Sequence, residues 1–152
     1  MAVVCARRAG LIANVTRWVS FGPLDARDAD AEDRILAVEA DVFDGTVPGA
    51  STSDLIELVA VSYPRHGFAA DEWRRHHQGG PAGYAGRDPR ATPGGLDRFA
   101  DGQAFTWNPS GDGAKVEDTV LLTGSGVRAL TFDPRWPVRV VGGRARPVTL
   151  VR

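Results

Sequence analysis

The sequence predicts an α+β domain in which helices pack on one face of a mostly antiparallel sheet. Three observations support this: strand-like segments open the chain, two helical segments follow, and strand-like segments return in the last third. A chain of 152 residues that is 43% hydrophobic and 24% charged can bury an ordinary core. We therefore expect one domain over residues 1–152, with many turns because Gly (18) and Pro (10) are frequent.

The chain opens with a predicted β-hairpin. Residues 3–5 are β-like, residues 8–10 form a turn, and residues 11–21 are rich in β-branched and aromatic side chains. Because the first strand starts almost at residue 1, with no helix or cap before it, we expect the domain to be N-terminally incomplete. Cys5 lies in this strand and is expected to be a small buried residue.

Two helices are predicted next. Apolar residues recur at helical spacing over residues 28–43, and Gly45 follows as a stop. After a turn at residues 47–49, residues 51–54 can cap a second helix, which Pro64 and Gly67 end. Residues 79–102 are rich in Gly, Pro, Asp and Arg and are expected to form a loop.

The last third returns to strands. The segments are residues 103–107, 116–123 and 127–132, with a turn at residues 124–126 between the second and third. Trp107, in the first of them, is expected to pack in the core or at a subunit contact rather than to bind a substrate ring.

The composition excludes several classes of protein. A net charge of −1 argues against a nucleic acid or an anionic membrane as the main partner, because both require a basic face. One cysteine excludes an intramolecular disulfide, and no apolar run is long enough to span a bilayer. We therefore expect a cytoplasmic protein.

Adjacent histidines form the first segment that could carry chemistry. On an extended segment, His76 and His77 would point to opposite faces, so at most one of them should face a given site. Two surface histidines in a polar loop are the more common arrangement. Gly79 and Gly80 follow, and they would let the backbone pass close to another chain or a ligand.

Two further segments carry polar residues at strand ends. Asn108 precedes a proline and is typical of a turn. Alternation places Lys115 and Glu117 on one face of a strand, where a solvated ion pair would contribute less than ~1 kcal/mol. Arg87 and the adjacent Asp88 are expected to form a local ion pair in a loop, with contact to a substrate as the less common alternative.

In order and spacing, these segments resemble the pita-bread metallopeptidases. That family includes methionine aminopeptidase, Xaa-Pro aminopeptidase, prolidase and the metal-free relative creatinase. The matching segments are residues 14–17 (Asn-Val-Thr-Arg), 47–49 (Val-Pro-Gly), 77–80 (His-Gln-Gly-Gly), 106–109 (Thr-Trp-Asn-Pro) and 115–118 (Lys-Val-Glu-Asp). The resemblance covers essentially the whole chain and implies the family's curved, mostly antiparallel sheet. The family's catalytic domain is longer, so the chain would be its later portion.

The resemblance also implies two divalent metals held by two Asp, one His and two Glu. No carboxylate stands in the opening strand where the first Asp belongs. The second Asp is replaced by Asn14, the His is kept as His77, the first Glu is replaced by Asn108, and the second Glu is kept as Glu117. Tyr84 stands where the family has a histidine that stabilises the tetrahedral intermediate.

Charge disfavours a dinuclear centre in this sequence. Three carboxylates are missing, and each charge pair at ligand-like separation contributes roughly 4 kcal/mol at an effective dielectric near 20. One divalent metal ion remains open as a cofactor, with His77 and Glu117 as ligands and Asn14 and Asn108 as weaker ones.

The first functional hypothesis is an Xaa-Pro aminopeptidase-like hydrolase with a mononuclear or metal-free centre. It would act on the N-terminus of peptides or on a small amide, with His77 and Glu117 in acid/base roles and Tyr84 or Lys115 donating a hydrogen bond to the oxyanion. The second is a catalytically inactive peptide-binding or dimerisation module on the same fold, which leaves a homodimer open. The third is a truncated chain that needs an N-terminal portion to fold.

Overall fold

A computed structural model describes residues 1–152. The helices are α1 (Ala26–Gly45), α2 (Thr52–Arg65) and the short 3₁₀ helix η1 (Glu72–Arg75). The strands are β1 (Ala2–Arg8), β2 (Leu11–Arg17), β3 (Val19–Ser20), β4 (Gly79–Ala82), β5 (Ala104–Trp107), β6 (Ser110–Gly111), β7 (Ala114–Lys115), β8 (Asp118–Thr123), β9 (Gly126–Ala129), β10 (Val138–Val141), β11 (Arg144–Pro147) and β12 (Leu150–Val151). This arrangement confirms the predicted α+β class.

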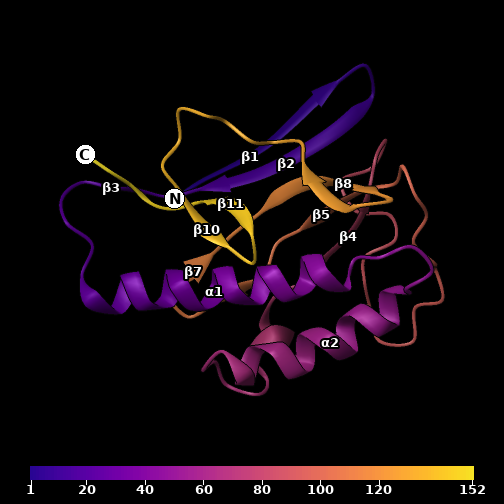
Figure 1. Ribbon diagram of the computed structural model, residues 1–152, viewed down its shortest axis with the longest axis horizontal. Coiled ribbons are helices and arrows are strands. Elements are labelled where there is room, and N and C mark those ends of the chain that lie inside the picture. The colour runs from indigo at the N-terminus through magenta and orange to yellow at the C-terminus, as the bar shows by residue number, and fades with distance from the viewer.

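The strands form one four-stranded sheet and several two-stranded pairs. The sheet has the order β4-β5-β8-β9 and is antiparallel throughout. The β1-β2 hairpin joins it through an antiparallel bridge between Thr16 and Glu117, and only β12 pairs in parallel, with β3. Figure 1 shows α1 and α2 together on one side of these strands, as expected.

The two helices begin at side-chain caps that the sequence contains. The Asp25 side chain accepts a hydrogen bond from the backbone of Asp28 at the start of α1. Ser51 and Asp54 form a reciprocal capping box at the start of α2. Both helices exceed the predicted ranges only at their ends, and Pro64 lies in the last turn of α2 rather than beyond it.

One hydrophobic core lies between the helices and the sheet. Its largest fully buried members are Trp107, Tyr63, Phe105, Ile35, Leu36, Leu55 and Leu122. The Phe105 and Trp107 rings stack with centroids 5.5 Å apart, so the predicted core position of Trp107 is confirmed. No helix has both the length and the apolar character that crossing a membrane requires.

Two local predictions are wrong. Cys5 is exposed, because β1 is an edge strand whose seven residues are all exposed. Residues 79–82 form strand β4 rather than loop. A side chain at Gly79 would place its Cβ 2.1 Å from the carbonyl oxygen of Thr106, so glycine is what allows β4 to pair with β5 there.

Candidate functional site

An open pocket of about 820 Å³ brings most of the predicted site residues together. Its lining includes His77, Asn14, Asn108, Lys115 and Glu117, which come from four separate segments of the chain. These residues, which lie far apart in the sequence, therefore converge on one pocket in the fold. Tyr84 does not line this pocket.

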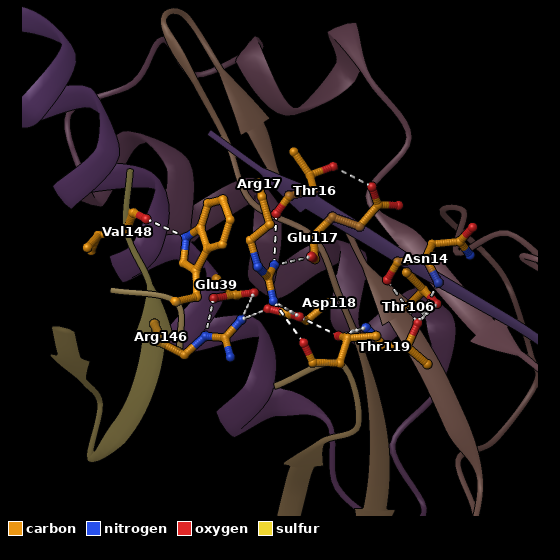
Figure 2. Close-up of polar contacts among 12 residues, drawn as sticks. Asn14, Thr16, Arg17, Glu39, Thr106, Glu117, Asp118, Thr119, Arg146 and Val148 are labelled. Atoms are coloured by element: carbon orange, nitrogen blue, oxygen red, sulfur yellow. Dashed lines mark hydrogen bonds and ion pairs between the residues drawn. The ribbon is translucent and has the colours of Figure 1, made fainter. Parts of the chain in front are cut away.

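Strand β2 holds Asn14 against Thr119 of β8 and Thr16 against Glu117, the residue that precedes β8. The backbone N–H of Thr16 donates to the carbonyl of Glu117 at 3.0 Å, and the backbone N–H of Asn14 donates to Thr119 Oγ1 at 2.8 Å. Thr119 Oγ1 in turn lies 3.0 Å from Thr106 Oγ1 on β5 (Figure 2). Threonines on adjacent strands thus fix the backbone that carries the two pocket residues.

The β4–β5 pairing places His77 beside Asn108. The backbone N–H of Asn108 donates to the carbonyl of Gln78 at 3.0 Å, which extends the ladder one step past β5. Asn108 is 2% exposed, so it is a pocket wall residue rather than the surface turn residue that its Asn-Pro sequence suggested.

Both adjacent histidines line the pocket, which corrects the expectation that only one would. Their rings stack with centroids 4.5 Å apart. The segment is not a regular strand, because the Gln78 side chain binds the carbonyls of Trp73 and His76 at 2.6 and 2.9 Å and bends the chain there. Alternation of side chains across a strand therefore does not apply.

Burial lowers the pKa of His77 to about 4, and the neighbouring His76 and the Arg87 cation act in the same direction. The pKa of His76 is also lowered, by burial and by the Lys115 cation. Both imidazoles are therefore uncharged at neutral pH.

Glu117 is fully engaged by protein groups. Its Oε2 accepts a hydrogen bond from Thr16 Oγ1 at 2.6 Å, and its Oε1 pairs with the Arg87 guanidinium. Arg87 forms this pair in place of the expected one with Asp88. The Glu117 and Arg87 side chains are 4% and 12% exposed, so the pair is shielded from water.

Lys115 lines the pocket without pairing to Glu117. Its Nζ donates to Ser110 Oγ at 3.3 Å, and burial lowers its pKa. Tyr84 is 76% exposed and packs near Gly10 in the β1–β2 turn. The loop after β4 places Tyr84 beside this turn and outside the pocket, so the oxyanion role that the resemblance implied for it has no geometric support.

A buried ion-pair network fixes the strand next to Glu117. Arg146 binds both oxygens of Glu39 at 2.6 and 2.7 Å and also pairs with Asp118. Asp118 pairs as well with Arg17 at 2.8 Å (Figure 2). The two carboxylates outweigh the cost of burial and raise the pKa of Arg146, so it stays charged. Arg17 is therefore a structural cation rather than a surface arginine.

The donors present do not fit a divalent metal ion. No group of three or more His, Cys, Asp or Glu side chains is arranged to hold one. The remaining carboxylate, Glu117, already binds a guanidinium, and a dication at that carboxylate would be repelled by the Arg87 charge. Asn14 and Asn108 would offer only neutral oxygens.

Four polar atoms beside the pocket are buried without a hydrogen-bond partner. They are Asn14 Nδ2, Arg87 Nε, His77 Nδ1 and Asn108 Oδ1. Buried polar atoms are normally paired, so a cluster of unpaired ones at a cavity is typical of a ligand site.

No protein-family model matches the sequence, and no curated protein matches it. Solved structures do match. The X-Pro aminopeptidase from Thermotoga maritima is 18% identical with a TM-score of 0.75, and the match covers 99% of this chain and 40% of that one. The prolidase from Pyrococcus furiosus is 21% identical with a TM-score of 0.74, covering 88% and 41%.

A third match is the N-terminal domain of the FACT complex subunit SPT16 from Eremothecium gossypii, 18% identical with a TM-score of 0.65, covering 80% of this chain and 31% of that one. The chain thus spans about two fifths or less of the structures it matches. At these identities the similarity establishes the fold, and the chain has the pita-bread fold of the prolidases and X-Pro aminopeptidases.

Proposed function

We propose that this chain is a divergent member of the pita-bread peptidase family that hydrolyses a peptide or small amide without a bound metal ion. Its activity would resemble that of an Xaa-Pro aminopeptidase, acting at the N-terminus of the substrate. The observation that carries the proposal is an uncharged His77 with an unpartnered Nδ1 in the same pocket as Glu117 and Lys115.

In this mechanism, water attacks the substrate carbonyl carbon while the His77 imidazole accepts a proton from the water. The C–O bond forms, and the carbonyl electron pair moves to an oxyanion that the Lys115 amine stabilises by charge and hydrogen bonding. The oxyanion electron pair then re-forms the carbonyl as the C–N bond breaks, and His77 gives the proton to the leaving nitrogen, which releases an amine and a carboxylic acid. Glu117 holds Arg87 and Thr16 in place and does not transfer a proton.

The second candidate function is a catalytically inactive ligand-binding or dimerisation module. The Arg87–Glu117 pair favours it, because that pair removes the kept carboxylate from both metal binding and base catalysis. Asn14 and Asn108 preserve hydrogen-bonding capacity without charge. One protein with a similar fold is named as a subunit of a complex rather than as a peptidase.

Turnover distinguishes the two functions. The purified chain is incubated with Xaa-Pro peptides, other dipeptides and small amides, with and without added divalent metals, and amine release is measured. The hydrolase proposal predicts release without added metal, which His77→Ala abolishes and His66→Ala leaves intact. His66 is the matched control, because it pairs with Asp41 outside the pocket.

The module predicts no release on any substrate, together with unchanged ligand binding in His77→Ala. Size-exclusion chromatography with light scattering then tests whether the chain forms a homodimer. Absence of release across the panel, in protein whose circular dichroism shows it folded, would contradict the hydrolase proposal.

A further inference from the structure

We propose that Arg87 is a built-in cation that takes the place of a metal ion in this pocket, and that it binds the carboxylate of a small ligand that also carries an N–H group. This inference deepens the proposed function, because it names the chemical class of the peptide or amide that the pocket would accept. It makes Arg87 a binding residue and assigns unpaired pocket atoms to the ligand.

The first argument is the state of the Arg87 guanidinium. Nη2 pairs with Glu117, and Nη1 donates to the Gly86 carbonyl at 3.1 Å. Nε is buried and has no partner. These two contacts use two of the five guanidinium N–H groups and hold the group in place, and the Nε–H is among those that remain free, so Arg87 is oriented before any ligand arrives. A fixed guanidinium with a free N–H is suited to a planar carboxylate.

The second argument is the position of Asn14. It is 5% exposed, and its Nδ2 is an unpaired donor. A Cβ added at Gly86 would lie 3.6 Å from that Nδ2, so the loop that carries Arg87 runs directly past the Asn14 amide. Asn14 and Arg87 therefore line the same pocket, and each carries an unpaired donor, so the two residues can serve one anionic group.

The third argument is the charge of the pocket lining. Arg87, Arg90 and Lys115 are cationic, and Glu117 is the only carboxylate. This excess of positive charge repels a metal cation and attracts an anion.

The remaining unpaired atom explains why the ligand should also carry an N–H group. Asn108 Oδ1 is an acceptor without a partner, and Asn108 is 2% exposed. A carboxylate cannot donate to it, whereas an amide or amine N–H can. An N-acylated amino acid or a peptide end carries both groups within a few bonds of each other.

Binding of N-acetylglycine and of its uncharged methyl ester to the whole chain tests the proposal. The two probes share the amide N–H and differ in the carboxylate. Isothermal titration gives both affinities, and the ¹⁵N–¹H signal of the Arg87 Nε group reports contact. We expect the ester to bind about tenfold or more weakly, the effect of losing one charge-assisted hydrogen bond, and the acid alone to shift the Arg87 signal.

Variants separate binding from folding. Arg87→Gln should weaken N-acetylglycine binding by about tenfold or more, whereas Arg135→Gln, which removes an exposed arginine outside the pocket, should not. Because Arg87→Gln leaves Glu117 unpaired, the double variant Arg87→Gln/Glu117→Gln supplies a second version without a buried charge. It too should lose binding.

Several results would overturn the proposal. They are equal affinities for acid and ester, no saturable binding of N-acetylglycine, unchanged binding in folded Arg87 variants, or tight binding of Mn²⁺ alone. Binding of the acid without turnover of any amide would refute the hydrolase and leave the carboxylate site standing. Equal turnover of acidic and neutral amides would refute the carboxylate site and leave the hydrolase proposal standing.

Discussion

Replacing Arg146 by methionine should destabilise the fold far more than replacing an exposed arginine. Arg146 lies on β11 and is 3% exposed, and it binds both oxygens of Glu39, which is fully buried on α1. It also pairs with Asp118 at the start of β8. The side chain therefore ties the C-terminal hairpin, the long helix and the central sheet to one another.

The magnitude follows from the charge that is left behind. After Arg146→Met, the Glu39 carboxylate has no cation to bind, whereas Asp118 keeps its pair with Arg17 at 2.8 Å. Breaking a buried pair by removing one partner costs about 3–5 kcal/mol, because the other charge stays buried and uncompensated. Glu39→Leu/Arg146→Met removes both charges and should recover most of that loss.

Urea unfolding followed by circular dichroism measures these changes as free energies of unfolding. The matched control is Arg135→Met, whose partner Asp133 and own side chain are exposed to solvent, and it should produce no measurable change. An Arg146→Met loss of less than about 1 kcal/mol, or a double variant as unstable as the single one, would refute the reasoning.

Three further predictions concern the sheet, the histidines and the core. Gly79→Ala should lower the melting temperature strongly, because its Cβ would lie 2.1 Å from a backbone oxygen at a φ of +120°, whereas Gly124→Ala, which has nothing within 4 Å, should not. His77 should titrate in NMR spectra with a pKa of about 4. Since its pKa is lower folded than unfolded, the unfolded chain binds more protons between about pH 6.5 and 4, so His77 lowers stability as pH falls through that window. In His77→Gln the fall in stability over that window should be shallower, and an unchanged slope would contradict the assignment. The isolated chain should unfold in one cooperative thermal transition, because its buried apolar residues form a single core; a gradual loss of signal would support the need for an N-terminal portion.

Local sequence patterns predicted most of the helices and strands. The helices around residues 28–43 and after residue 51 follow from apolar spacing and Asp or Ser caps, and both are present. Strand β4 escaped prediction because glycine and proline ordinarily mark loops, whereas here Gly79 allows a close approach to β5 that a side chain would prevent. Cys5 is exposed because no other element covers strand β1 of the β1–β2 hairpin. Such coverage depends on tertiary packing, which a local sequence pattern does not report.

Five residues that the sequence motifs singled out lie in one pocket, whereas the contact made by a loop arginine was missed. Asn14, His77, Asn108, Lys115 and Glu117 all reach one pocket. Arg87 was assigned to a local pair because Asp88 is adjacent, and no local pattern shows that it reaches Glu117, 30 positions further along.

The one available signal for that contact was charge. A buried carboxylate at a site that no longer binds metal ions requires another cation, because an uncompensated buried charge is costly. An arginine in the loop after the histidines is a natural source, and sequence alone gives no distance by which to choose among the many arginines.

Elemental analysis of the protein purified without chelators tests most directly whether this pocket works without a metal. Because Arg87 already neutralises Glu117, we predict far less than one divalent ion per chain. The control variant Arg135→Gln should contain no more metal than the unaltered chain. One divalent metal ion per chain, lost in Glu117→Gln and His77→Ala, would contradict a metal-free pocket.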